Sequence, residues 1–258
     1  MKKIFQNIGR RLGYEIISTS HYKRLQKKWE IPTFDCFQHI KDIIKPDALI
    51  FDIGANVGQS TNKFKSYFPK SSIFAFEPVL NTYNALLTNI SHLDKVRSYQ
   101  IALAKESGNF EIYHRENSEW NSLVPNLNKN SGNNSDSKEL IETVSLDEFM
   151  QKNDISHIDF LKSDTEGFEL SVLQGAATAL INSKIDMLYI EVGFLKEDEQ
   201  HTYFQEVFDL LEKHNYGFCG LYEVSLGYDL RAYYANALFM SKGQLKNNKE
   251  IKSFLHNN

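Results

Sequence analysis

The chain has 258 residues, of which 41% are hydrophobic and 13% aromatic, so it can bury the core of one α/β domain with an N-terminal appendage. A formal net charge of −4 supplies no global basic field, so a nucleic acid partner is not expected. Cys36 and Cys219 lie far apart without a Cys/His cluster, which predicts neither a disulfide framework nor a zinc site and fits a reducing, cytoplasmic environment.

Residues 1–45 form a basic segment at the start of an acidic chain. Polar residues and a glycine interrupt its beginning, so the apolar core of a signal peptide is missing, and no apolar run in the chain is long enough to span a bilayer. Ile4, Phe5, Ile8 and Leu12 would share one helical face. We favour a helix that packs on its own domain, and a weak contact with an anionic membrane or a partner protein is the alternative.

Residues 46–242 are predicted to form one domain in which strands and helices alternate, ahead of a polar tail over 243–258. Such alternation indicates a mostly parallel sheet with helices on both faces. In chain order the expected elements are a strand at 49–53, a helix at 58–67, a strand at 72–77, a helix at 80–90, a strand at 97–103, an extra, partly exposed strand at 109–114, a short strand running into a helical turn at 143–150, a strand from 158, a helix through 170–180, a strand at 185–191, a helix at 202–214 and closing strands near 216–224 and 233–240.

The segment 120–138 has the composition of a loop, and its second half is almost wholly Asn, Ser, Lys and Gly. One interpretation is a flexible flap over the site where a substrate would bind. The alternative is an inert loop, since Asn-rich sequence is also common as biased composition.

Gly54 and Gly58 follow the first predicted strand, and Glu77 ends the second. The glycines allow the backbone to turn tightly against a ligand, and an acid at the second strand end can reach the two hydroxyls of an adenosine ribose. Asn56 stands where the dinucleotide fingerprint needs a glycine, so NAD is disfavoured. The pattern Asp-x-Gly-x-x-x-Gly with a later acid instead resembles an S-adenosylmethionine site, although such residues can also simply punctuate a strand-helix-strand unit. The predicted cofactor-binding residues are Asp52, Gly54, Ala55, Asn56, Gly58, Glu77, Pro78 and Ala102.

The ends of two later strands carry Lys162, Asp164, Glu166 and Glu191, and ligands of open α/β sheets bind at such ends. A positioned carboxylate can remove the proton of an aliphatic hydroxyl as an electrophilic methyl group is attacked, and neighbouring acids raise one another's pKa. Alternatively, the first two acids cap the following helix. The second candidate base is His114. No metal ligand is predicted, and a divalent metal such as Mg²⁺ is not indicated, although acids of this kind could bind one.

Taken together, these motifs resemble the FkbM family of S-adenosylmethionine-dependent methyltransferases over about residues 48–240. The motifs are Phe51–Gly58, Phe76–Pro78, Ser145–Asp147, Ile158–Glu169, Val172–Ala176, Ile190–Glu191 and Ala235–Phe239. The resemblance implies a Rossmann-like class I methyltransferase fold, with a seven-stranded, mostly parallel sheet and a C-terminal antiparallel hairpin. It also implies O-methylation of a hydroxyl, often on a sugar of a bacterial glycan or on a secondary metabolite. Lys162-Ser163-Asp164 departs from the family's usual Lys-Ile-Asp or Lys-Met-Asp but keeps the charged positions.

The leading interpretation is therefore an S-adenosylmethionine-dependent O-methyltransferase with a carbohydrate or glycan-intermediate acceptor. A non-catalytic glycan-binding or assembly module would be indicated by loss of the cofactor acid or glycines, all of which are present. A nucleotide-dependent oxidoreductase would need a glycine at Asn56 or another turn compatible with pyrophosphate. Acceptor choice is expected to depend on the flap, the arm and residues 222–234.

Overall fold

A computed structural model describes residues 35–113, 138–198, 200–227, 229 and 231–247. The basic arm before Asp35, His114 and nearly all of the predicted flap lie outside the described residues. Within the described part of the chain, no helix is long and apolar enough to cross a membrane.

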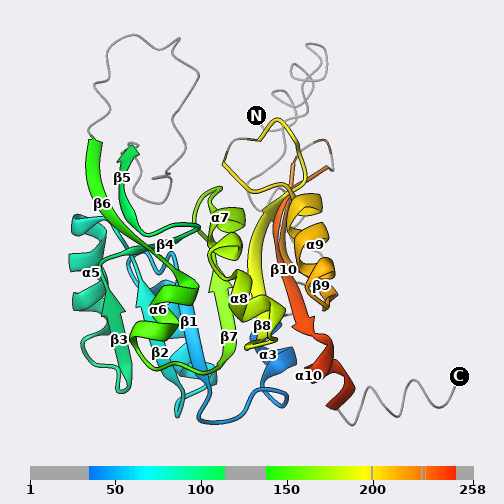
Figure 1. The fold of residues 1–258 in the computed structure, drawn as a ribbon, viewed down its shortest axis with the longest axis horizontal. Helices are drawn as coiled ribbons and strands as arrows, with labels where there is room; N and C mark the ends of the chain where they lie inside the picture. Colours follow the sequence, from blue (N-terminus) through cyan, green and yellow to red (C-terminus); the bar gives the residue numbers. More distant parts are fainter. Residues whose placement is uncertain (1–34, 114–137, 199, 228, 230, 248–258) are drawn as a thin grey trace, which may run out of the picture. The chain divides into compact units, whose positions relative to one another are not determined.

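The centre of the fold is a seven-stranded sheet with the order β3-β2-β1-β7-β8-β10-β9 (Figure 1). Its strands are β1 (Leu49–Ile53), β2 (Ser72–Phe76), β3 (Val96–Tyr99), β7 (Ile158–Ser163), β8 (Ile185–Gly193), β9 (Tyr216–Leu226) and β10 (Ala232–Ser241). The first five in this sheet order pair in parallel, whereas β10 runs antiparallel to both β8 and β9. The predicted mostly parallel sheet with a C-terminal antiparallel hairpin is confirmed.

Helices cover both faces of this sheet. On one face lie α3 (Cys36–Ile40), α4 (Gln59–Tyr67) and α5 (Leu80–Ile90), and on the other lie α6 (Leu146–Lys152), α7 (Glu169–Gln174), α8 (Ala177–Ile181) and α9 (Phe204–Lys213). The second group covers the face turned to the viewer in Figure 1, and α10 (Lys242–Asn247) follows β10. Alternate strand residues point to opposite faces, so Ile50 packs beneath α3 and α4 while Phe51 and Ile53 pack beneath α6. Burial of such side chains contributes roughly 1.5–3 kcal/mol each.

Residues 97–103 do not form one strand, and that prediction was wrong. The chain leaves the main sheet after Tyr99 and enters a second sheet of order β4-β6-β5, formed by β4 (Ala102–Ala104), β5 (Gly108–Tyr113) and β6 (Lys138–Ser145). Ala102 to Ala104 pair in parallel with the end of β6. The strand β6 begins at Lys138, which is earlier than the strand predicted at 143–150. This crossover matters for function because Ile101, Ala102 and Leu103 reach the pocket described below.

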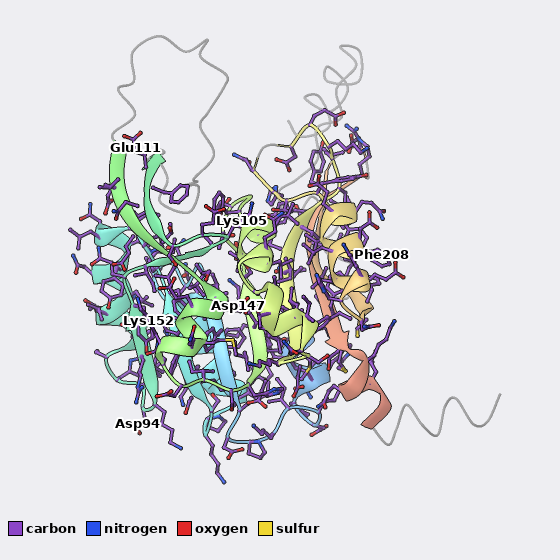
Figure 2. The ribbon with its side chains drawn as sticks, viewed as in Figure 1. Asp94, Lys105, Glu111, Asp147, Lys152 and Phe208 are labelled. Atoms are coloured by element: carbon purple, nitrogen blue, oxygen red, sulfur yellow. The ribbon has the colours of Figure 1, made fainter. Side chains whose placement is uncertain are left out.

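The single helix predicted over 170–180 is in fact two helices, α7 and α8. Gly175 lies between them and packs so closely on β4 that an added Cβ would be 2.0 Å from the Ala104 carbonyl oxygen. The second helix then begins with a cap from α6, since Asp147, labelled in Figure 2, accepts the backbone N–H groups of Thr178 and Ala179 at 2.7 and 2.9 Å. Tertiary contacts therefore interrupt a continuous helical pattern.

The compact unit begins at Asp35, so the last part of the segment predicted as a separate arm packs on the core. Cys36, Phe37 and Ile40 are buried against the sheet. Asp35 caps α3 by accepting the N–H of Phe37 at 3.0 Å, and its second oxygen accepts the hydroxyl of Tyr67 at 2.7 Å.

Candidate functional site

A pocket of about 360 Å³ lies at the carboxyl ends of β1, β2, β7 and β8, where ligands of open α/β sheets bind. Among the predicted site residues, it is lined by Gly54, Ala55, Asn56, Glu77, Pro78, Ala102, Lys162, Asp164, Glu166 and Glu191. The sequence therefore predicted many, though not all, of the residues that gather here. His114 lies outside the described residues.

Gly54 forms the turn that closes the end of β1. It has φ 72°, and an added Cβ would be 1.8 Å from the carbonyl oxygen of Asp164. The N–H groups of Gly54 and Ala55 both donate to the carbonyl oxygen of Phe76, at 3.1 and 2.9 Å. Only glycine allows β1, β2 and β7 to end this close together.

Asp52 and Gly58 do not line the pocket, although both were predicted to bind the cofactor. Asp52 is fully buried, and its carboxylate accepts the hydroxyls of Ser60 and Thr61 at 2.7 and 2.6 Å. Gly58, at φ 94°, is the N-cap of α4. These two residues shape the turn from β1 into α4, and other residues of this turn line the pocket.

Glu77 follows β2 and faces the pocket from a nearly closed environment, with 7% of its surface exposed. Its oxygens accept the backbone N–H groups of Asn56 at 3.2 Å and Val79 at 3.0 Å. Burial raises the pKa of Glu77 to about 7, although these two N–H groups favour the charged form. Beside it, the side-chain oxygen of Asn56 is buried without a hydrogen-bond partner. An unsatisfied acceptor that lines a pocket is available to a polar ligand.

Lys162, Asp164 and Glu191 form a charge-coupled group at the other side of the pocket. The Lys162 ammonium lies 3.0 Å from Asp164 and 3.8 Å from Asp52. Burial opposes ionisation of Asp164, but the charge of Lys162 and hydrogen bonds from Glu191 and Lys162 outweigh it and hold the pKa of Asp164 below its ordinary value. Burial, followed by the charge on Asp164, raises the pKa of Glu191. These opposite shifts place a proton on Glu191 in preference to Asp164.

Glu166 belongs to the tight turn after β7, where it has φ 54°. The helix-capping alternative for Asp164 and Glu166 is wrong, because Phe168 is the N-cap of α7 and no side chain caps that helix. Oxygens of Asp164, Glu166 and Glu191 lie within 4.8 Å of one another, a spacing that a cation could bridge. The Lys162 ammonium, 3.0 Å from Asp164, offsets part of the negative charge there.

Two further parts of the site were missed by the sequence reasoning. Glu169 is fully buried in α7 and accepts the Thr165 N–H at 2.6 Å and the Thr202 hydroxyl at 2.6 Å, so it joins the turn after β7 to the loop after β8. Burial raises the pKa of Glu169. His201, in the same loop as Thr202, lies 4.0 Å from Glu191. The available signal for Glu169 was its position in the charged motif after β7, whereas His201 lies in a loop without a motif.

The strand order, with its antiparallel final pair and its pocket at the ends of the first two strands, is that of a class I methyltransferase-like α/β fold. Residues 52–218 match the model of the methyltransferase FkbM domain, and the chain belongs to this family of S-adenosylmethionine-dependent methyltransferases.

The similar curated proteins include 2-O-methyltransferase NoeI of Sinorhizobium fredii, which is 27% identical over 179 residues, covering 65% of this chain and 72% of the relative. Hexuronic acid methyltransferase AglP of Haloferax volcanii is 26% identical over 168 residues, covering 64% of each chain. Among solved structures, M. capricolum TrmK with S-adenosyl-homocysteine aligns with a TM-score of 0.46 at 14% identity, over 81% of this chain and 70% of that one.

The pocket residues fit S-adenosylmethionine. Glu77 offers carboxylate oxygens to a ribose, and the free acceptor of Asn56 can take a hydrogen bond from a polar group. Ionised Asp164 lines the same pocket and offers a negative charge to a positively charged sulfonium. These residues would hold the cofactor.

Proposed function

We propose that this protein transfers a methyl group from S-adenosylmethionine to a hydroxyl of a sugar. The observation that carries the proposal is the Asp164–Glu191 pair, whose carboxyl groups line the pocket, hydrogen-bond to each other and lie next to Lys162. Bound S-adenosylmethionine supplies an electrophilic methyl group on a sulfonium. Membership in the FkbM family argues against the oxidoreductase and the non-catalytic module.

The three side chains have separate roles in this proposal. Asp164 accepts a hydrogen bond from the acceptor hydroxyl and takes its proton as the new O–C bond forms, because the hydroxyl becomes strongly acidic at that stage. Lys162, 3.0 Å away, keeps Asp164 ionised and ready to accept. Glu191 donates its hydrogen bond to Asp164 and so fixes the orientation of that carboxylate.

A sugar as the acceptor is supported by two features. Ionised carboxylates are strong acceptors for neighbouring hydroxyls, which a sugar presents in pairs. The relatives NoeI and AglP carry names that describe a 2-O-methyltransferase and a hexuronic acid methyltransferase. Their identity with this chain, 27% and 26%, leaves the particular sugar open.

The test is transfer of a labelled methyl group from S-adenosylmethionine to methyl glycosides of neutral hexoses and of glucuronic acid, with catechol as a non-sugar comparison. We expect label in a glycoside and none in catechol. Glu77→Ala should weaken S-adenosylmethionine binding in calorimetry at least about tenfold, because the buried N–H groups of Asn56 and Val79 lose their acceptor. The exposed Glu212→Ala serves as the control. Label in catechol alone would overturn the sugar assignment, and cofactor affinity unchanged in Glu77→Ala would overturn the cofactor site.

A further inference from the structure

The loop between β8 and α9 places a histidine and an aspartate behind the acidic pair. His201 Nδ1 lies 2.7 Å from Asp198 Oδ2, and His201 Nε2 lies 4.0 Å from Glu191 Oε2. Glu191 is in turn hydrogen-bonded to Asp164. Ionisable groups therefore follow one another from the pocket to Asp198, with one gap of 4.0 Å between Glu191 and His201.

The imidazole of His201 is held in place from several sides. It stacks on the ring of Tyr234, with centroids 4.5 Å apart and an interplanar angle of 11°. The next residue returns to the sheet, where the Gly193 N–H donates to the Thr202 carbonyl oxygen at 2.8 Å. An added Cβ on Gly193 would be 2.8 Å from the Cβ of His201, so glycine is needed for this approach. The Thr202 hydroxyl donates to buried Glu169. A ring fixed this firmly has a defined nitrogen facing Glu191.

The tautomer of His201 follows from these contacts. A proton on Nδ1 donates to Asp198, and the lone pair of Nε2 is then turned toward Glu191. Imidazole can accept a proton at one nitrogen and release a proton from the other. The His201 and Asp198 side chains are 12% and 16% exposed, so a proton that reaches them can pass to solvent.

The proposed reaction leaves one proton in the site at each turnover. The O–H bond of the acceptor breaks, the O–CH₃ bond forms, and the electron pair of the C–S bond stays on sulfur. Asp164 is a weak base because of Lys162, and Glu191 already carries a proton. The pair must lose one proton before it can retain another.

We propose that His201, held by Asp198, removes the proton of Glu191 and passes it to solvent, which lets the Asp164–Glu191 pair accept the hydroxyl proton. The inference rests on the proposed function. In this sequence the hydroxyl proton goes to Asp164, the Glu191 proton goes to Nε2 of His201, and the Nδ1 proton leaves through Asp198. One bridging water or a small rotation of the Glu191 carboxyl spans the 4.0 Å gap. His201 does not line the pocket and acts through Glu191, so it is a positioning residue.

The first test needs no acceptor or cofactor: a pH titration of the imidazole groups of the ¹⁵N-labelled protein by NMR. The groups that face His201 are Asp198 from its own loop, Glu191 from β8, Tyr234 from β10 and, beyond Glu191, Asp164 after β7. We expect Glu191→Gln to shift the pH at which His201 titrates by about half a unit or more, because an amide cannot exchange a proton with Nε2.

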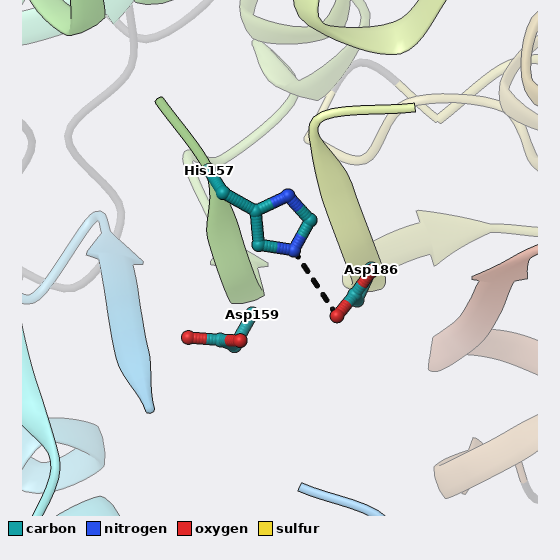
Figure 3. Close-up of side chains that lie close together, drawn as sticks. All are labelled: His157, Asp159 and Asp186. Atoms are coloured by element: carbon teal, nitrogen blue, oxygen red, sulfur yellow. Dashed lines mark ion pairs between the residues drawn. The ribbon is translucent and has the colours of Figure 1, made fainter. Parts of the chain in front are cut away.

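His157 provides a matched internal control, because it pairs with Asp186 at 3.1 Å between the same two strands, β7 and β8 (Figure 3). Its titration should be unchanged in Glu191→Gln and should move in Asp186→Asn. A His201 titration that moves in Asp198→Asn but not in Glu191→Gln would overturn the proposal, since His201 would then only hold its loop.

The second test uses the glycoside that accepts label. His201→Gln, which retains a hydrogen-bonding side chain, should lower kcat about tenfold or more and change the pH dependence of kcat, with little change in the KM for S-adenosylmethionine. His157→Gln should leave kcat, its pH dependence and the KM for S-adenosylmethionine unchanged. A rise in KM with an unaltered pH profile would contradict the proton role. Failure of every glycoside to accept label would count against the proposed function and leave the NMR result standing on its own.

Discussion

The two ends of strands β7 and β8 carry similar groups of side chains with different surroundings. At the carboxyl ends, Asp164, Glu166 and Glu191 surround a pocket, and a histidine lies behind them. At the amino ends, His157, Asp159 and Asp186 also lie within 4.8 Å of one another (Figure 3).

The side chains at the amino ends have hydrogen-bond or ion-pair partners among their neighbours. Asp159 accepts the backbone N–H of Leu49 at 2.7 Å and pairs with Lys45 at 2.9 Å, while His157 pairs with Asp186. Near the pocket, by contrast, two acids hydrogen-bond to each other beside Lys162, and burial raises the pKa of Glu191. Under the proposed function, position beside the pocket distinguishes a reactive group from a structural one of similar composition.

The largest expected effect is that of Gly54→Ala at the carboxyl end of β1. The new Cβ would overlap the Asp164 carbonyl oxygen, and φ 72° is unfavourable for alanine, so the turn must open. We expect destabilisation of about 2 kcal/mol or more, and S-adenosylmethionine binding at least about 100-fold weaker. Urea unfolding and calorimetry measure the two effects. In the control Gly108→Ala, the nearest neighbour of the new Cβ is 4.0 Å away, and both values should stay near wild type. Wild-type affinity in Gly54→Ala would show that the pocket does not depend on this turn.

The next prediction compares matched acid-to-amide changes at the two ends. Asp164→Asn and Glu191→Gln should reduce the rate of methyl transfer to a glycoside by roughly 10²- to 10⁴-fold, because an amide at 164 cannot take the acceptor proton and an amide at 191 cannot release a proton to make room for it. Asp159→Asn and Asp186→Asn should leave that rate near wild type, since neither residue lines the pocket. Thermal melting accompanies the rate measurements. A large loss of rate in Asp186→Asn at unchanged stability would break the distinction between the two ends.

Local patterns were sufficient to predict most of the pocket. Gly54 and Glu77 were identified because each ends a strand, and strand ends meet at one edge of a parallel sheet. Lys162 and Asp164 were expected to face the same way because they are two residues apart on a strand, and they lie 3.0 Å from each other.

Features that depend on distant contacts could not be predicted. The break between α7 and α8 requires the approach of Gly175 to Ala104, and the split of residues 97–103 requires the pairing of β4 with β6. His201 approaches Glu191 only because Gly193 leaves room for the returning loop. None of these arrangements has a periodicity or a spacing that marks it in the sequence.

The smallest expected effect is a pH-dependent contribution of His157 to stability. The hydrogen bond with Asp186 raises the pKa of His157, and the negative charges of Asp186 and Asp159 raise it further. Burial and the positive charge of Lys45 act in the opposite direction, but the net shift is upward. A raised pKa in the folded state stabilises the protein below the unfolded pKa of about 6.5, and the stabilisation is lost as the pH rises through the folded pKa. Because the side chains are 38% and 22% exposed, solvent screening limits the effect to about 0.5 kcal/mol or less.

Urea unfolding at pH 5.5 and 8.5 tests this contribution. His157→Gln and Asp186→Asn should each lower the free energy of unfolding at pH 5.5, where imidazole and carboxylate are both charged in the folded protein. At pH 8.5 the imidazole is neutral, so the ionic part of the difference should vanish. The exposed His92→Gln is the control and should show no such change with pH. A loss of stability in His157→Gln that is equal at both pH values would mean that this histidine contributes by packing alone, and the amino-end group would then be structural without being a titrating ion pair.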